Sequence, residues 1–210
     1  MFGIENYPLF ISSGILLNIT PGNDTIYILT RSIAQGRTAG IFSVLGITSG
    51  AIVHTLLAAF GISALCSEIP GLFLGITLLG GTYLVYLGIR TFTGTTLPIP
   101  SVSTDIAPTA VPIIYRQGFL TNLLNPKVAL FYLSFMPQFI NPSYGNKAIP
   151  FLLLGVTFMT TGTLWCMLLA VFSSRFTSIL RKERRISNCL KFASGSIFIG
   201  LGIKLFFERF

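Results

Sequence analysis

Charged side chains are scarce in this sequence: only 10% of its 210 residues are Asp, Glu, Lys or Arg, and only six are acidic. A soluble domain carries about 25% charged residues, so this chain has too few to cover a surface that faces water. Its hydrophobic content of 52% and mean hydropathy of +0.78 also exclude a disordered chain. We therefore expect an integral membrane protein.

Cysteines are few in this sequence, and known catalytic motifs are absent. Cys66, Cys166 and Cys189 are odd in number and scattered, so they predict neither a disulfide framework nor a metal cluster. The sequence has no Ser–His–Asp, HExxH or paired-aspartate motif, and no nucleotide-binding glycine loop with its lysine. We expect no enzyme, no metal, no cofactor and no use of ATP within this chain.

Long apolar runs stand in place of the missing charges. Six stretches come near or exceed the roughly 20 apolar residues that cross a membrane as a helix: 8–30, 39–65, 71–92, 118–140, 148–173 and 192–207. None of them alternates apolar and polar residues as a membrane β-strand must, so we predict an all-α protein with six transmembrane helices. The first stretch is expected to be retained, because Met1–Pro8 lacks the basic region of a cleavable signal peptide.

The basic residues predict the orientation of these helices. Ten of the 14 Lys and Arg residues fall in three alternate connections, 30–38, 90–117 and 174–191. Because cytoplasmic loops of membrane proteins are enriched in Lys and Arg, we place these connections in the cytoplasm and both termini outside. The net charge of +8 then reflects the orientation of the protein in the membrane. The other interpretation, a nucleic-acid site at the basic stretch 181–185, is poorly supported by six bases in one short loop.

A Pro-, Thr- and Ser-rich connector divides the chain near its middle. We expect a first three-helix repeat at 1–93, a cytoplasmic connector at 94–117 and a second three-helix repeat at 118–210. Three predicted helices separate corresponding segments, so the second repeat is inverted relative to the first. Inverted repeats with interrupted helices are a recurring architecture of secondary transporters.

Matching helix breaks support this repeat. Pro21, followed by Gly22, lies in the first stretch and Pro126 in the fourth, half the chain length apart, and each proline precedes a tyrosine by six residues. Proline removes a backbone donor and frees a carbonyl, and in lipid such groups must line a polar cavity or be buried in protein. A plain proline kink would explain one of these breaks. Two matching breaks, each with Asn and a charge, favour a site.

Two charged residues, Asp24 and Lys127, lie deep inside these stretches. An ionisable residue at the bilayer centre costs at least about 2.5–3.5 kcal/mol, and a pair of opposite charges that face each other would lower that cost. In the functional interpretation Asp24 binds a substrate ammonium or takes up and releases a proton. Lys127 then pairs with Asp24 or binds a substrate carboxylate. A purely structural ion pair is the alternative. The neighbouring amides complete the candidate substrate and proton-coupling site: Asn18, Asn23, Asn122 and Asn125.

The remaining candidates have two interpretations each. His54, the one histidine, has a reference pKa near about 6.5 that suits proton transfer, but it can equally be packed and bonded to a neighbouring helix. Arg31 and Arg37 are interpreted as anchors at the cytoplasmic end of the first helix. The glycines, such as Gly46 and Gly50, are expected to allow close packing of helices, either within the chain or in a homodimer.

These residues, in this order and spacing, resemble the LysE/RhtB family of amino-acid exporters, over nearly the whole chain apart from 94–112. The first half carries Thr20-Pro21-Gly22-Asn23-Asp24-Thr25, Arg31-Ser32, Gln35-Gly36-Arg37, Gly46-Ile47-Thr48-Ser49-Gly50 and His54-Thr55-Leu56-Leu57-Ala58-Ala59. The second half carries Gly118-Phe119-Leu120-Thr121-Asn122, Asn125-Pro126-Lys127, Phe131-Tyr132, Pro137-Gln138-Phe139 and Gly202-Ile203-Lys204-Leu205.

The resemblance implies an exporter of the inner membrane that moves amino acids or close derivatives outward, driven by the proton gradient. One residue departs from the family pattern: Asn23 stands where the family usually has a second proline, so the first helix is expected to break less sharply. The alternatives are a gated channel or facilitator for small polar solutes and a membrane scaffold. A scaffold would not need charges in two matching broken helices. The sequence does not select an amino acid, a coupling ion or an oligomeric state.

Overall fold

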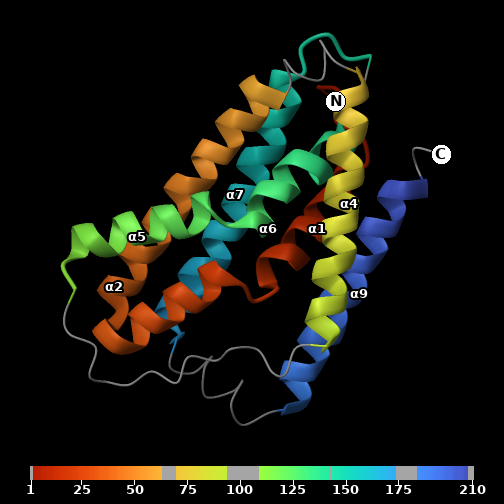
Figure 1. Cartoon of the computed structure of the whole chain (residues 1–210). Coiled ribbons are helices and arrows are strands. Elements are labelled where there is room, and N and C mark those ends of the chain that lie inside the picture. Colours follow the sequence, from red (N-terminus) through yellow and green to blue (C-terminus); the bar gives the residue numbers. More distant parts are fainter. Residues whose placement is uncertain (1, 63–69, 94–108, 142, 174–183, 208–210) are drawn as a thin grey trace.

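The computed structural model describes residues 2–62, 70–93, 109–141, 143–173 and 184–207, and the regular secondary structure in these ranges consists of helices. In these ranges the helices are accompanied by a single isolated β-bridge, between Ile4 and Ile140. The prediction of an all-α protein is confirmed (Figure 1).

Each of the six predicted stretches falls on helical structure. In chain order the elements are α1 (Tyr7–Ile19), α2 (Asn23–Leu56), the π-helix η1 (Leu57–Ile62), α4 (Pro70–Thr93), α5 (Val111–Leu123), α6 (Pro126–Leu130), the π-helix η2 (Phe131–Phe135), the 3-10 helix η3 (Met136–Phe139), α7 (Ala148–Val171) and α9 (Arg184–Phe207). Among the described residues, Asn23–Gly61 and Ala148–Val171 are long and apolar enough to cross a membrane, judged by length and composition.

Helix α2 consists of two arms joined by a sharp turn at Gly36. Gly36 has φ 81° and ψ −178°, a backbone conformation that costs a residue with a Cβ atom far more than glycine. The first arm (23–35) and the second arm (37–56) pack closely, because a Cβ on Gly40 would overlap the Ser32 side chain. The connection expected at 30–38 is thus a one-residue turn between helices, visible as the bend of α2 in Figure 1.

Both predicted breaks are present. Helix α1 ends at Ile19 and α2 begins at Asn23, with Pro21 in the gap; α5 ends at Leu123 and α6 begins at Pro126. The residue before a proline disfavours helical geometry, and Thr20 is accordingly extended, with ψ 116°. Pro126 instead opens α6, where its missing N–H has no helical partner to lose.

Two element boundaries differ from the expectation. Helix α5 begins at Val111, so the last part of the expected connector 94–117 is helical. Pro112, inside the expected connector, lies in the first turn of α5, where its fixed φ suits a helix. Helix α9 begins at Arg184, so the last part of the expected basic connection 174–191 is also helical, whereas 94–108 and 174–183 lie outside the described residues.

Two apolar clusters flank the breaks. One is rich in aromatic residues and joins α1, the segment 131–139 and α7; it contains Phe10, Phe131, Phe135, Phe139 and Phe158, all buried. The other joins the two arms of α2 to α7 and contains Ile28, Leu29, Val44, Ile47, Leu169 and Ala170. The clusters hold the broken segments in place between them.

Helices α4 and α9 pack side by side through glycines (Figure 1). A Cβ on Gly202 would come within 2.7 Å of the Gly81 carbonyl oxygen on α4, and a Cβ on Gly195 within 3.1 Å of the Gly88 carbonyl oxygen. Small residues let two backbones approach this closely. Gly46 and Gly50 of α2 serve the same kind of packing within the chain, against α5.

Gly202→Ala is expected to lower the free energy of unfolding by about 1–3 kcal/mol, because the new methyl group overlaps backbone atoms of α4 that cannot yield. Gly200 provides a matched control two residues earlier on α9, since a Cβ there would meet no atom within 4 Å. Gly200→Ala is expected to be neutral or slightly stabilising. Unfolding in detergent measures both variants, and equal behaviour would contradict this packing.

Candidate functional site

Asp24 is held by two asparagines from the other half of the chain. Asn122 Nδ2 donates to Asp24 Oδ2 at 2.8 Å, and Asn125 Nδ2 donates to Asp24 Oδ1 at 3.1 Å. Both asparagines are 3% exposed. They flank the break between α5 and α6, while Asp24 lies in the first turn of α2. The carboxylate therefore joins the two breaks directly.

Lys127 makes the reciprocal connection. Its Nζ donates to the carbonyl oxygens of Leu17 at 3.2 Å and Thr20 at 2.9 Å, at the end of α1. Gly22 leaves space for it, because a Cβ there would lie 3.2 Å from the Lys127 Nζ. The ammonium thus binds carbonyl oxygens at the carboxyl end of α1.

Asp24 and Lys127 bind different groups and form no ion pair with each other. Both residues are described, and the structure gives them separate partners: amides for the carboxylate and carbonyls for the ammonium. The reason lies in the helix ends. The amino end of a helix carries partial positive charge and the carboxyl end partial negative charge, so Asp24 suits the start of α2 and Lys127 the end of α1.

Asn125 also shapes the second break. Its side-chain oxygen accepts a hydrogen bond from the Lys127 backbone N–H at 3.1 Å and so caps α6. One asparagine therefore serves both the helix start, through its oxygen, and Asp24, through its nitrogen. Asn122 differs, because its Oδ1 is buried and accepts no hydrogen bond from any described residue. That oxygen can accept one further donor.

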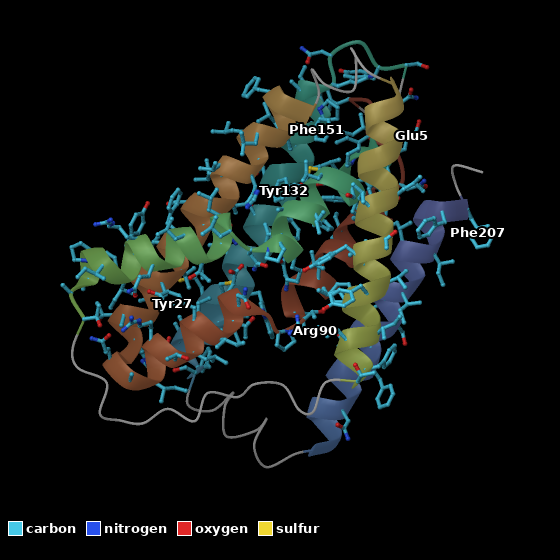
Figure 2. The ribbon with its side chains drawn as sticks, viewed as in Figure 1. Glu5, Tyr27, Arg90, Tyr132, Phe151 and Phe207 are labelled. Carbon is cyan, nitrogen blue, oxygen red and sulfur yellow. The ribbon has the colours of Figure 1, made fainter. Side chains whose placement is uncertain are left out.

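His54 lies behind Asn122 on the second arm of α2. Its Nε2 is 3.3 Å from the backbone oxygen of Asn122, and because a carbonyl only accepts, Nε2 carries the proton. The ring stacks on Tyr132 with 5.6 Å between centroids, and the Tyr132 hydroxyl lies 2.9 Å from Thr55 Oγ1. This agrees with a packed histidine bonded to a neighbouring helix. Figure 2 shows Tyr132 inside the bundle.

A small cavity of about 40 Å³ lies beside Asp24. It has room for water, which needs about 10–15 Å³ measured in this way, but it is far below the roughly 300–1,000 Å³ of typical small-molecule sites. Its polar lining comes from four helices: Asn18, Asp24, Thr48, Asn122, Thr163 and Cys166. In this conformation the cavity beside Asp24 is therefore too small for an amino acid.

The structure brings most of the predicted site residues together but separates one. Asn18 lines the cavity and donates to Thr161 Oγ1 at 3.2 Å on α7. Asn23 is exposed and lines an outer groove instead, because successive helical residues point about 100° apart. The lining of the cavity does not include Asn125, Lys127 or His54, which contact the residues around it.

Three lining residues were not predicted. Thr48 Oγ1 lies 3.0 Å from Thr163 Oγ1 across the interface of α2 and α7, and Cys166 lies one helical turn after Thr163. Polar residues inside long apolar helices tend to face the protein interior. The few polar residues within the second and fifth apolar stretches could therefore have indicated this part of the cavity lining.

Comparisons with known proteins agree with one another. The family model of the LysE type translocators matches residues 15–209. An uncharacterized membrane protein of Pseudomonas aeruginosa is 28% identical over 206 residues, covering 97% of this chain and 95% of that protein. A second uncharacterized membrane protein, from Bacillus subtilis, is 29% identical over 202 residues, covering 93% of this chain and 95% of that protein.

A relative with a named activity has similar coverage. The leucine efflux protein of Salmonella typhimurium is 26% identical over 206 residues, covering 97% of this chain and 96% of that protein. No solved structure matches the chain. Because the family model spans nearly the whole chain, including both breaks and all the cavity-lining residues, the chain belongs to the LysE type translocator family and is a membrane transporter, not an enzyme.

Proposed function

We propose that this transporter exports amino acids or close derivatives across the cytoplasmic membrane by proton antiport. The observation that carries the proposal is the Asp24 carboxylate, held between two broken helices and beside a small polar cavity. The leucine efflux protein among the relatives supports an amino acid as the substrate.

Six membrane-spanning segments in two inverted repeats are part of this proposal. Each half begins with a broken helix, α1 with the first arm of α2 or α5 with 126–139. Two further helical segments follow in each half: the second arm of α2 and α4, or α7 and α9. The basic connections lie on the cytoplasmic side and both termini outside, as the distribution of Lys and Arg favours.

Substrate binding follows from the polar groups at the cavity. In the open state the ammonium of the amino acid binds Asp24 and donates a further hydrogen bond to the unused Asn122 Oδ1. Its carboxylate is directed to Lys127, whose ammonium is the cation at the breaks. A small zwitterion thus brings a positive group to Asp24 and a negative group to Lys127.

Proton coupling assigns a second role to Asp24. A carboxylate that binds either a proton or a substrate ammonium cannot bind both, so protonation from outside releases the substrate and deprotonation inside allows it to bind. Asn122 and Asn125 orient the carboxylate for this exchange. An open channel is disfavoured, because the cavity holds about 40 Å³ and aromatic residues pack beneath it.

An export assay tests the substrate class. Cells with and without the protein are loaded with each of the twenty amino acids, supplied as dipeptides, and with homoserine, and release into the medium is followed. We expect at least one compound to leave several-fold faster when the protein is present. Equal release of all of them would overturn the amino-acid assignment.

A vesicle assay tests the coupling. Inverted membrane vesicles take up an exported substrate when a pH gradient, acidic inside, is imposed, and we expect accumulation above the outside concentration. The ionophore nigericin, which collapses the gradient, should abolish it. Equilibration to the same concentration on both sides, with or without the gradient, would identify a channel or facilitator.

A further inference from the structure

An open groove runs between the first arm of α2 and helix α5, outside the cavity at Asp24. It consists of two adjoining hollows, of about 380 Å³ and 500 Å³, that share Asn23, Tyr27 and Thr121. Figure 2 shows Tyr27 between these two helices. The volumes lie within the roughly 300–1,000 Å³ of small-molecule sites, so the groove has room for a whole amino acid.

The groove has polar groups along both walls. Thr30 and Arg31 continue the wall of the first arm, and Gln117 lies on the wall formed by α5. Polar groups at membrane depth are tolerated beside water and not against lipid. We therefore take the groove as a water-filled route, and Asn23 places its inner end directly beside Asp24.

Arg31 is the cation of this groove, and every acceptor that binds it is neutral. Its Nη1 donates to Gln35 Oε1 and to Thr109 Oγ1, each at 3.0 Å, and its Nη2 donates to Gln117 Oε1 at 2.7 Å. The guanidinium also lies 5.7 Å from the centre of the Tyr27 ring. Arginine has five N–H donors, so these three bonds do not use all of them.

We propose that Arg31 binds the carboxylate of the outgoing amino acid in this groove, before the ammonium reaches Asp24. The inference rests on the proposed function and its orientation. A carboxylate accepts two parallel hydrogen bonds from a guanidinium and carries the charge that the neutral acceptors lack. It therefore competes with the neutral Gln117 oxygen for the guanidinium.

The spacing makes this a separate site. Arg31 lies two turns after Asp24 on one helix, a rise of about 10 Å. An α-amino acid carries its ammonium and carboxylate on the same carbon atom, so it cannot bind both residues at once. Binding at Arg31 and binding at Asp24 are successive steps along the first arm, and Arg31 acts on entry.

Arg37 differs from Arg31, although both were interpreted as anchors. Arg37 follows the Gly36 turn, is exposed and is not part of the groove lining. Arg37→Gln therefore removes the same charge near the Gly36 turn without touching the groove, which makes it the matched control.

The test measures initial uptake into inverted vesicles, whose outer face is the cytoplasmic face. The probe is the amino acid that the wild-type protein exports best, with its carboxamide as a competitor. Arg31→Gln is expected to raise the half-saturating concentration about tenfold and to change the maximal rate less than twofold. Arg37→Gln should change neither, and the carboxamide, which lacks the negative charge, should compete equally in the wild type and in Arg31→Gln.

Gln117→Leu separates binding from a structural role of Arg31. If Arg31 binds substrate, loss of the competing Gln117 oxygen leaves the half-saturating concentration unchanged or lower. If Arg31 only clamps the first arm to α5, Gln117→Leu reproduces the loss seen in Arg31→Gln, which overturns the inference. A half-saturating concentration within twofold of wild type in Arg31→Gln overturns it as well. Failure of the wild-type protein to transport any amino acid would instead overturn the proposed function, and this inference with it.

Discussion

Asp24→Asn is expected to reduce export at least about 100-fold while the protein remains folded. The amide has the shape of the carboxylate but can neither attract an ammonium nor carry a proton. Hydrogen bonds to a charged group contribute about 1.5–3 kcal/mol each, and about 3 kcal/mol corresponds to roughly a 100-fold change. Folding is expected to survive, because the variant removes a charge that is costly to bury.

Glu5→Gln is the control for this variant. Glu5 is an exposed acid before α1, so its replacement removes the same charge away from the breaks (Figure 2). Transport rates are divided by the amount of protein in the membrane, and thermal unfolding in detergent verifies the fold. An Asp24→Asn variant that keeps half of the wild-type rate would exclude Asp24 from both substrate binding and coupling.

Lys127→Met is expected to abolish export and to lower the free energy of unfolding by about 3 kcal/mol or more. It removes two hydrogen bonds of a charged donor, to Leu17 and Thr20, each worth about 1.5–3 kcal/mol. The methionine fills the same space, so the loss arises from the two carbonyls, which remain at the end of α1 without their donor.

Two further variants decide how Lys127 acts. Lys147→Met, at the residue before α7, removes a lysine that is not at the breaks and should have little effect on unfolding. Lys127→Arg keeps the charge, but the larger guanidinium does not fit beside Gly22, so we expect little rescue. Full stability of Lys127→Met, measured by unfolding in detergent, would contradict the role of the ammonium at the first break.

The helices and their breaks could be predicted because each depends on local chemistry. Length and apolar content indicate the helical stretches, and a proline disfavours helical geometry in the residue before it wherever it lies. The breaks at Pro21 and Pro126 followed from this. The start of α5 did not, because Pro112 opens a helix as readily as it interrupts one, and the choice depends on α5 packing against α2.

The partners of the charges could not be predicted, because they depend on where helix ends meet. The sequence indicates that Asp24 and Lys127 are buried, and opposite charges suggest a pair. The structure instead assigns Asp24 to two amides and Lys127 to two carbonyls. The position of Asn23 could not be predicted either, because it depends on the direction of the side chain around the helix axis. Asn23 lines the groove, whereas Asp24 lines the cavity.

The reciprocal contacts of Asp24 and Lys127 tie the two halves of the chain together crosswise. The first half holds the ammonium of the second, and the second half holds the carboxylate of the first. If one break shifted alone, it would leave a bare charge in a region of low dielectric constant. We therefore expect the two breaks to move together, because a partly displaced state would leave one of these charges without its partners.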